Sequence, residues 1–292
     1  MVEKCDTTVG EIYLWVRTNL KNSGITGYEY ESRLILSRVL ECEDVFIFTH
    51  AGDPVDCDKI DLITEYTKKR IKGMPLQYIT GTSYFMGLSF GVNEHVLIPR
   101  PDTEILVQKA VEIMESNGYT KVLDIGTGSG CIAISISFYK KDSLVDALDI
   151  NENALDLAKK NSIIHCVSDR IEFIHSDIYG SLYKEPKFSG YQVIVSNPPY
   201  IKTDEYNTLQ DEVRLYEPAS ALLAGDDGLL FYDRICKDAH KFLVDDGYLL
   251  FETGYKQAGS VCEIMRKYGF SDICVTKDFS GIDRVVFGRN GC

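Results

Sequence analysis

The stretch of sequence that decides the fold, residues 121–138, reads KVLDIGTGSGCIAISISF. Residues 121–125 form an apolar run that predicts a strand, and residues 131–138 predict a helix. Between them lie three glycines, Gly126, Gly128 and Gly130. They let the backbone turn tightly and let a ligand approach without a Cβ in the way. The stretch therefore predicts the first strand, turn and helix of an α/β sheet with a ligand at the turn.

Strands and helices alternate along the rest of the chain. We expect strands at 144–150, 171–176, 191–196 and 248–252, and helices from Thr103 and at 154–164, 229–242 and 259–268. The last two strands, 272–277 and 284–288, predict an antiparallel hairpin at one edge of the sheet. Strands that alternate with crossover helices indicate an α/β fold, a doubly wound and mostly parallel seven-stranded sheet.

The amino-terminal part of the chain shows a helical pattern without predicted strands. Residues 1–78 predict a small helical bundle, in which Thr8 and Glu11 fit a capping box and Trp15 is a core residue. The basic cluster Lys68-Lys69-Arg70 is either a solvated helix end or a binding patch. Residues 79–98 mix aromatic residues with glycines and predict a linking β-hairpin. We expect the sheet domain to cover residues 99–292.

Composition narrows the classes of partner. The chain has 292 residues and a net charge of -13, so it is not built to neutralise phosphates, and a nucleic-acid partner is disfavoured. Its nine cysteines are scattered without a C-x-x-C pair, which predicts reduced thiols and no metal site. The amino terminus lacks a basic region followed by an apolar stretch, and no run is long enough to cross a bilayer. We therefore expect a cytoplasmic protein.

An acidic residue after the second strand points to the kind of ligand. Asp149 ends that strand, 23 residues after Gly126, where a carboxylate can accept both hydroxyls of a ribose. The glycines have the spacing G-x-G-x-G, whereas a dinucleotide fold normally has G-x-G-x-x-G. The pattern predicts a nucleoside-containing cofactor, with a glycine spacing that differs from that of the dinucleotide folds.

A tetrapeptide follows the fourth strand of the sheet: Asn197-Pro198-Pro199-Tyr200. Its prolines have no N–H and hold the preceding residues extended, so the backbone carbonyls stay free to accept hydrogen bonds. The Asn197 side-chain oxygen is a second acceptor, and the Tyr200 ring is a flat stacking surface. The four residues form either a pocket for the NH2 group of a planar system or an ordinary turn that closes a strand.

The glycine motif, preceded by Asp124, resembles the first motif of class I S-adenosylmethionine-dependent methyltransferases. The resemblance implies a Rossmann-like fold, S-adenosylmethionine as the cofactor and S-adenosylhomocysteine as its product. Asp177, after the third strand, stands where that family contacts the adenine. Its alternative role is a carboxylate that caps its own loop. Beside a methyl donor, acceptors on an NH2 group would orient an otherwise weakly nucleophilic amide nitrogen.

Taken together, the motifs resemble the release-factor glutamine methyltransferases, the HemK or PrmC family of protein-(glutamine-N5) methyltransferases. The resemblance covers nearly the whole chain. The stretches that carry it are residues 75–81, 97–104, 126–130, 197–201, 216–218, 221–222, 225, 227–229 and 278–285. Asn-Pro-Pro-Tyr alone is shared with adenine-N6 methyltransferases, whereas residues 97–104 are much more specific.

This resemblance implies a substrate and a set of roles. The substrate would be the glutamine of the Gly-Gly-Gln motif of peptide-chain release factors, which the amino-terminal bundle would help to dock. The catalytic residues would be Asn197, Pro198, Pro199 and Tyr200. The residues implied for cofactor binding are Gly126, Thr127, Gly128, Ser129, Gly130, Asp149, Asp177, Ile178 and Asn197.

Three positions depart from the family pattern. Asp102 stands where Glu is usual, Thr253 replaces a common Ile, and Ile178 replaces a Trp seen beside the adenine in some relatives. Two other functions stay open on the sequence. One is methylation of adenine in DNA or of an RNA base by the same tetrapeptide, which needs a channel for a flipped base. The other is a nucleoside-binding regulator without catalysis.

Overall fold

The computed structural model describes residues 7–184 and 190–291. The chain forms two compact units, Met1–Thr82 with Asp211–Tyr216, and Ser83–Gln210 with Glu217–Cys292. The first six residues, on which the expectation about the amino terminus rests, lie outside the described part. Two of the nine cysteines, Cys5 and Cys292, also lie outside it. No helix among the described residues is both long and apolar enough to cross a membrane.

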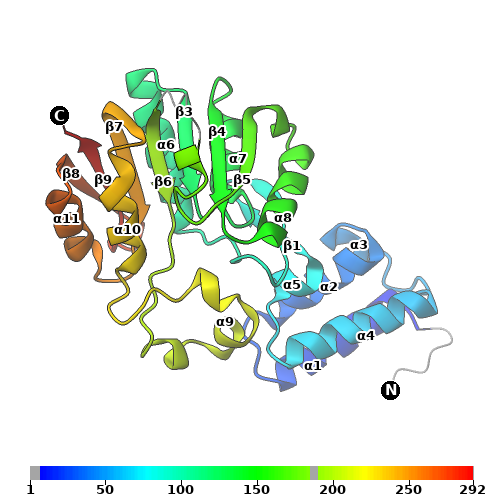
Figure 1. Ribbon diagram of the computed structural model, residues 1–292. Coiled ribbons are helices and arrows are strands. Elements are labelled where there is room, and N and C mark those ends of the chain that lie inside the picture. Colours follow the sequence, from blue (N-terminus) through cyan, green and yellow to red (C-terminus); the bar gives the residue numbers. More distant parts are fainter. Residues whose placement is uncertain (1–6, 185–189, 292) are drawn as a thin grey trace. The chain divides into compact units, whose positions relative to one another are not determined.

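The first unit is helical, as the periodicity of its apolar residues predicts (Figure 1). Its elements are α1 (Val9–Asn22), α2 (Tyr28–Leu40), α3 (Asp44–Thr49), α4 (Cys57–Ile71), α5 (Leu76–Thr80) and α9 (Asp211–Tyr216). The capping box is present: the Glu11 N–H donates to Thr8 Oγ1 at 3.3 Å, and the Thr8 N–H donates to Glu11 Oε2 at 2.9 Å. Trp15 packs against the core of this unit, as expected.

The basic cluster at the end of α4 divides into two kinds of residue. Lys68 is exposed and Lys69 forms a surface ion pair with Glu65, which fits a solvated helix end. For Arg70 the prediction of a solvated end is wrong, because its side chain is only 11% exposed. Its guanidinium pairs with Glu31 at 2.6 Å and with Glu212 of α9 at 3.1 Å. Arg70 therefore joins three segments of the first unit.

A β-hairpin opens the second unit, as the aromatic and glycine pattern predicts. Strands β1 (Thr82–Phe85) and β2 (Leu88–Gly91) are joined by Met86 and Gly87, both with positive φ. Two such residues are what a type I′ turn requires. The Met86 N–H donates to Glu104 Oε1 at 2.7 Å, and the Tyr139 hydroxyl donates to the Met86 carbonyl at 2.6 Å. These bonds hold the turn against two helices of the same unit.

The seven-stranded sheet has the order β5-β4-β3-β6-β7-β9-β8 (Figure 1). The strands β3, β4, β5, β6 and β7 are parallel, and β9 and β8 form the predicted antiparallel edge. Their bounds are β3 (Lys121–Ile125), β4 (Leu144–Asp149), β5 (Ile171–His175), β6 (Tyr191–Ser196), β7 (Leu243–Glu252), β8 (Phe270–Lys277) and β9 (Asp283–Asn290). The doubly wound, mostly parallel fold is confirmed.

Helices pack on both faces of this sheet. In one apolar cluster, side chains of α6 (Thr103–Asn117) and α7 (Cys131–Tyr139) meet Val122, Val193 and Val195. In the other, α10 (Leu230–Ala239) and α11 (Ala258–Lys267) meet Leu123 and Ile194. Successive residues of β3 and β6 thus face opposite clusters, which explains why apolar residues in these strands do not alternate with polar ones. The helix α8 (Glu152–Ile164) follows β4 and contacts it.

The strand β7 is longer than the sequence predicts, since it begins at Leu243 and not at Tyr248. The register shifts along its pairing with β6: Leu243 lies opposite Tyr191, whereas Tyr248 lies opposite Val193. The extra residues include Asp245-Asp246-Gly247, which have the composition of a turn. They lie at the irregularity of this pairing, between the paired residues Leu243 and Tyr248, and the local pattern cannot reveal such an irregularity.

Replacement of Arg70 tests how much its ion pairs stabilise the first unit. We expect Arg70→Met to lower the free energy of unfolding of this unit by about 2–3 kcal/mol, because Glu31 would lose its cationic partner in a mostly buried site. Trp15 is the only tryptophan of the chain, so its fluorescence in urea follows this unit selectively. The matched control is Lys69→Met, which breaks an exposed pair and should cost less than about 1 kcal/mol. Equal losses of unfolding free energy in Arg70→Met and Lys69→Met would contradict a stabilising role for the ion pairs of Arg70.

Candidate active site

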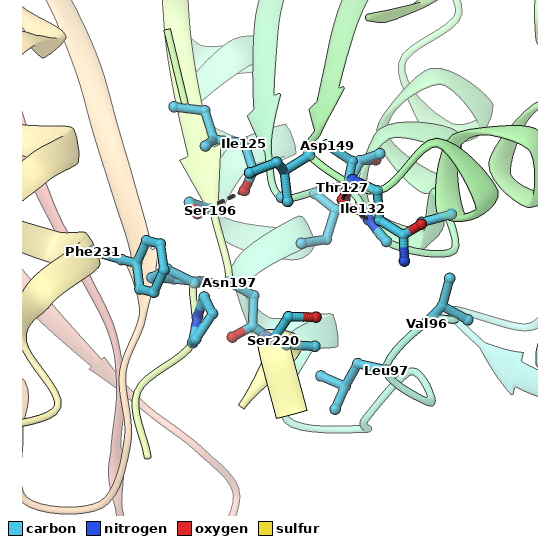
Figure 2. A pocket seen from close by; sticks show the side chains of 18 of the residues that line it. Val96, Leu97, Ile125, Thr127, Ile132, Asp149, Ser196, Asn197, Ser220 and Phe231 are labelled. Carbon is cyan, nitrogen blue, oxygen red and sulfur yellow. Dashed lines mark hydrogen bonds between the residues drawn. The ribbon is translucent and has the colours of Figure 1, made fainter. Parts of the chain in front are cut away.

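A cavity of about 380 Å³ opens at the carboxyl edge of the parallel strands (Figure 2). Such edges are where open α/β sheets bind ligands, and the volume is in the usual range for small-molecule sites. Figure 2 draws Thr127, Asp149, Asn197 and Phe231 around this cavity. The glycine loop, the acidic residues after β4 and β5 and the segment after β6 therefore contribute to one site.

The glycine loop connects β3 to α7, and its three glycines have φ angles of 77°, 55° and 81°. Gly126, Thr127, Gly128 and Ser129 line the cavity. Gly130 is not part of the lining. A Cβ at Gly130 would lie 2.9 Å from Ile134 Cδ1 and 3.0 Å from the Ala158 Cβ of α8. Gly130 thus permits close packing of the loop on α8, while a Cβ at Gly128 would point into open space.

Asp124 supports this loop from inside the sheet. The residue is fully buried, and its Oδ2 accepts a hydrogen bond of 2.6 Å from the Thr127 hydroxyl. Burial raises the pKa of Asp124 to about 7, although the bond from Thr127 acts in the opposite direction. Because Asp124 lies outside the cavity lining, it can act on a ligand only through the loop that it holds.

Asp149 lines the cavity and also holds its walls together. Its Oδ2 accepts the Gly128 N–H at 2.8 Å, and its Oδ1 accepts the Asn151 N–H at 2.9 Å. Burial raises the pKa of Asp149, while these backbone bonds lower it. Each carboxylate oxygen can accept more than one hydrogen bond, so the group keeps acceptor capacity for ligand hydroxyls.

Asp177 and Ile178 line the cavity as well, and Asp177 has a partner that the sequence did not indicate. Its Oδ2 accepts a hydrogen bond of 2.8 Å from Arg234 of α10. The loop is capped instead by Ser176, whose hydroxyl donates to the Ile178 carbonyl at 2.8 Å and accepts the Ser181 N–H at 3.0 Å. Loop capping is therefore the role of Ser176.

Three side chains of α10 belong to the same wall: Phe231, Arg234 and Ile235. The guanidinium carbon of Arg234 lies 5.8 Å from the centre of the Phe231 ring, within range of a cation–π contact. The sequence predicted this helix but gave no sign that its first turns face the cavity. The ring is a further apolar surface of the cavity that Ile178 also lines.

The segment Asn197-Pro198-Pro199 lines the cavity directly after β6. Asn197 Nδ2 donates to the Thr103 hydroxyl at 3.1 Å, and Ser196 donates to the Ile125 carbonyl at 2.7 Å. Figure 2 marks the second bond with a dashed line. The two bonds tie the segment to α6 and β3, so it forms part of the cavity wall.

Tyr200 lies outside the cavity lining, although the sequence predicted a stacking ring there. Its carbonyl accepts Gln257 Nε2 at 3.0 Å, and its Cδ2 lies 2.8 Å from the position of a Cβ at Gly254. Burial raises the pKa of the Tyr200 hydroxyl to about 12. In this structure Tyr200 packs beneath the segment that lines the site.

An ion pair that the sequence did not single out borders the cavity. Arg100 lines it and pairs with Glu217, whose side chain is 1% exposed. Both residues belong to stretches that carry the family resemblance, and no role was assigned to either. The pair joins the segment before α6 to the segment that supplies Ser220 and Ala221 to the lining.

Comparisons with known proteins give a consistent picture. The family model described as "Methyltransferase small domain" matches residues 102–232, and "PrmC N-terminal domain" matches residues 11–81. A release factor glutamine methyltransferase of Clostridium botulinum is 38% identical, with 92% of this chain and 95% of that protein covered. One from Clostridium acetobutylicum is 40% identical, with 93% and 95% covered.

Among solved structures, the hMettl16 catalytic domain in complex with the MAT2A 3′UTR hairpin 6 is 18% identical, with a TM-score of 0.54. The likeness covers 79% of this chain and 81% of that chain. At this identity the likeness supports the fold alone.

Gly128 and Gly130 offer a matched test of the loop. We expect Gly130→Ala to lower the free energy of unfolding of the second unit by roughly 2–4 kcal/mol, because positive φ and a clash with α8 act together. Gly128→Ala has the φ penalty without the clash, so it should cost about 1 kcal/mol. Hydrogen exchange of the β3 and α7 amides would measure both losses.

Binding should rank the same two variants in the opposite order. A methyl group at Gly128 would enter the cavity, so we expect Gly128→Ala to weaken S-adenosylmethionine binding at least tenfold by calorimetry, about 1.4 kcal/mol. The folded molecules of Gly130→Ala should lose less cofactor affinity than those of Gly128→Ala. Cofactor affinity unchanged by Gly128→Ala would argue against this loop as the binding site.

Proposed function

The chain belongs to the release factor glutamine methyltransferase family, and we propose that it methylates the glutamine of the Gly-Gly-Gln motif in peptide-chain release factors. The methyl group would go to the N5 atom of the side-chain amide. One observation carries the proposal: Asn197 lines the same cavity as the glycine loop and Asp149. An amide pocket and a nucleoside site therefore share one space. This function would act in the cytoplasm, where translation terminates.

The residues present fit S-adenosylmethionine, the cofactor of this class of enzyme. Gly126 and Gly128 leave open space where a Cβ would stand, so the backbone can lie close to the ligand. Asp149 is the acceptor for the ribose hydroxyls, and Thr127 and Ser129 complete that side of the cavity. The dinucleotide pattern, whose last glycine opens the helix beneath a pyrophosphate, is absent from this loop.

The adenine is assigned to the wall formed by Asp177, Ile178 and Phe231. Asp177 can accept a hydrogen bond from an exocyclic amino group, since a carboxylate oxygen bonded to Arg234 retains acceptor capacity. Ile178 and the Phe231 ring supply apolar surface in place of the Trp of some relatives. The departure at Ile178 is thus compensated by a side chain from α10.

When bound, S-adenosylmethionine would supply an electrophilic methyl group, which the amide nitrogen would take up in exchange for one proton, leaving S-adenosylhomocysteine. Asn197 and the Pro198 carbonyl orient the glutamine amide. As acceptors for the two N–H bonds of the glutamine, they fix the nitrogen and stabilise the positive charge that develops on it. The Asn197 bond to Thr103 and the prolines limit the movement of these acceptors.

The helical unit is proposed as a docking module for the release factor. Its support is the match of residues 11–81 to the PrmC N-terminal domain and the family to which the chain belongs. Recognition of a whole protein would supply affinity that one glutamine side chain cannot. The cavity would then need only to orient the glutamine amide and not to supply most of the binding energy.

The direct test is transfer of labelled methyl groups from S-adenosylmethionine to a release factor. We expect label on the intact factor and none on a factor whose Gly-Gly-Gln glutamine is replaced by Ala. Label that persists after that replacement would refute the glutamine assignment. Label on duplex DNA or RNA instead would favour base methylation. Cofactor binding without transfer to any of these acceptors would favour a regulator.

Two substitutions separate the proposed roles of Asn197 and Asp149. We expect Asn197→Ala to lower kcat by about 100-fold or more while cofactor affinity changes little, because a preorganised acceptor acts mainly in the transition state. Asp149→Ala should weaken cofactor binding by roughly 10- to 100-fold, since a charged acceptor for hydroxyls is lost. Asn153→Ala, at an exposed position outside the cavity, is the control. Equal effects of the first two variants on both parameters would show that the roles are assigned wrongly.

A further inference from the structure

A buried carboxylate lies behind the proposed amide pocket. Glu252 ends β7 with 1% of its surface exposed, and it does not line the cavity. In the parallel pairing of β6 with β7, Ser196 lies opposite Phe251, so the next residues, Asn197 and Glu252, are neighbours across the two strands. The carboxylate therefore stands beside the side chain that is proposed to orient the substrate.

Thr103 connects the two residues. It begins α6, is 2% exposed, and accepts the hydrogen bond from Asn197 Nδ2 at 3.1 Å. Hydrogen bonding by the Thr103 and Asn197 side chains favours the ionised form of Glu252. The second carboxylate oxygen, Oε2, has no hydrogen-bond partner among the described residues. A buried acid with one unpaired oxygen is costly, which calls for a functional explanation.

The charge of Glu252 decides which groups donate and which accept in the hydrogen bonds that link Glu252, Thr103 and Asn197. An ionised carboxylate can only accept, so the Thr103 hydroxyl must turn its proton toward Glu252. The Thr103 oxygen is then an acceptor, and only the NH2 end of the Asn197 amide can face it. The Asn197 Oδ1 is consequently turned away from Thr103, toward the cavity that Asn197 lines.

We propose that Glu252, both directly and through Thr103, fixes the orientation of the Asn197 amide and is a positioning residue for methyl transfer. The proposal rests on the function proposed above, in which Asn197 Oδ1 accepts a hydrogen bond from the glutamine NH2. An amide turned the other way would present its own NH2 to the substrate NH2. Two donors would then face each other, and the nitrogen would lose its orientation.

The charges around Glu252 set the pH at which this control operates. Burial raises the pKa of Glu252 to about 7, with Asp102 acting in the same direction and Arg284 in the opposite one. The other titratable groups that face it are Tyr200, Tyr232 and Cys131. Below about pH 7 Glu252 gains a proton and can donate to Thr103. The Thr103 hydroxyl is then free to donate to Asn197, which permits the amide to turn.

The experiment measures kcat for methylation of a release factor at saturating cofactor and saturating factor, between pH 6 and pH 8. For the unmodified protein we expect kcat to rise about tenfold over this range, because a pKa of about 7 leaves a tenth of Glu252 ionised at pH 6. In Glu252→Gln the rise should disappear, and kcat should stay below the plateau of the unmodified protein. Cofactor affinity should change less than threefold, which a general structural defect would not produce.

The pair Thr103→Ser and Thr103→Val tests the connection independently, should Glu252→Gln fold poorly. Ser keeps the hydroxyl and should keep the rise with pH, whereas Val has the shape of Thr without the hydroxyl and should lose it. Asp124 and Asp149, whose pKa values burial also raises, are retained in every variant, so a rise due to either would survive.

The outcomes separate this inference from the function on which it rests. If the unmodified protein does not methylate a release factor, the proposed function fails. If it does, and Glu252→Gln keeps the rise of kcat with pH, the positioning role is refuted. A rise that Thr103→Val keeps would refute the connection through Thr103. The positioning role would be supported if Glu252→Gln and Thr103→Val both lose the rise of kcat with pH while Thr103→Ser keeps it.

Discussion

The parallel register of four strands is the constraint on which the rest of the structure depends. Ile125 lies opposite both Leu148 and Ser196, and Ser196 lies opposite Phe251, so β3, β4, β6 and β7 end at the same level. The carboxyl ends of these strands therefore bring four groups to one edge: the glycine loop, Asp149, the Asn197 segment and Glu252. A slip of one residue would turn every side chain of a strand to the other face and would separate these groups.

The same edge holds two carboxylates that most sheets would not tolerate. Asp124 and Glu252 are almost completely buried, and burial raises the pKa of each to about 7. Neither lines the cavity, but each contacts a side chain that does, Thr127 for Asp124 and Asn197 for Glu252. Burial of these acids costs stability. We propose that in return they hold the glycine loop and the proposed amide pocket in place.

Local patterns were sufficient for most of the fold. The β6 strand, the glycine loop and the capping box at Thr8 were predicted correctly, because apolar periodicity, glycine placement and capping chemistry act over a few residues. The position of Asp149 in the site followed from the spacing of strand and helix. Family resemblance added the substrate class, which no physical pattern in the chain contains. The β7 strand was predicted too short, since Asp245-Asp246-Gly247 have the composition of a turn and lie at an irregularity in the pairing of β7 with β6.

The sequence by itself determined the alternation of strands and helices, the glycine loop and the carboxyl-edge location of Asp149 and Asn197, because each of these rests on neighbouring residues. Only the tertiary structure decided which side chains meet there. It removed Gly130 and Tyr200 from the cavity wall and added Phe231 and Arg234 of α10. It also buried Arg70 between two acids and set Glu252 beside Asn197. These partners are far apart along the chain, and strand register and helix packing, to which no local pattern is sensitive, bring them together.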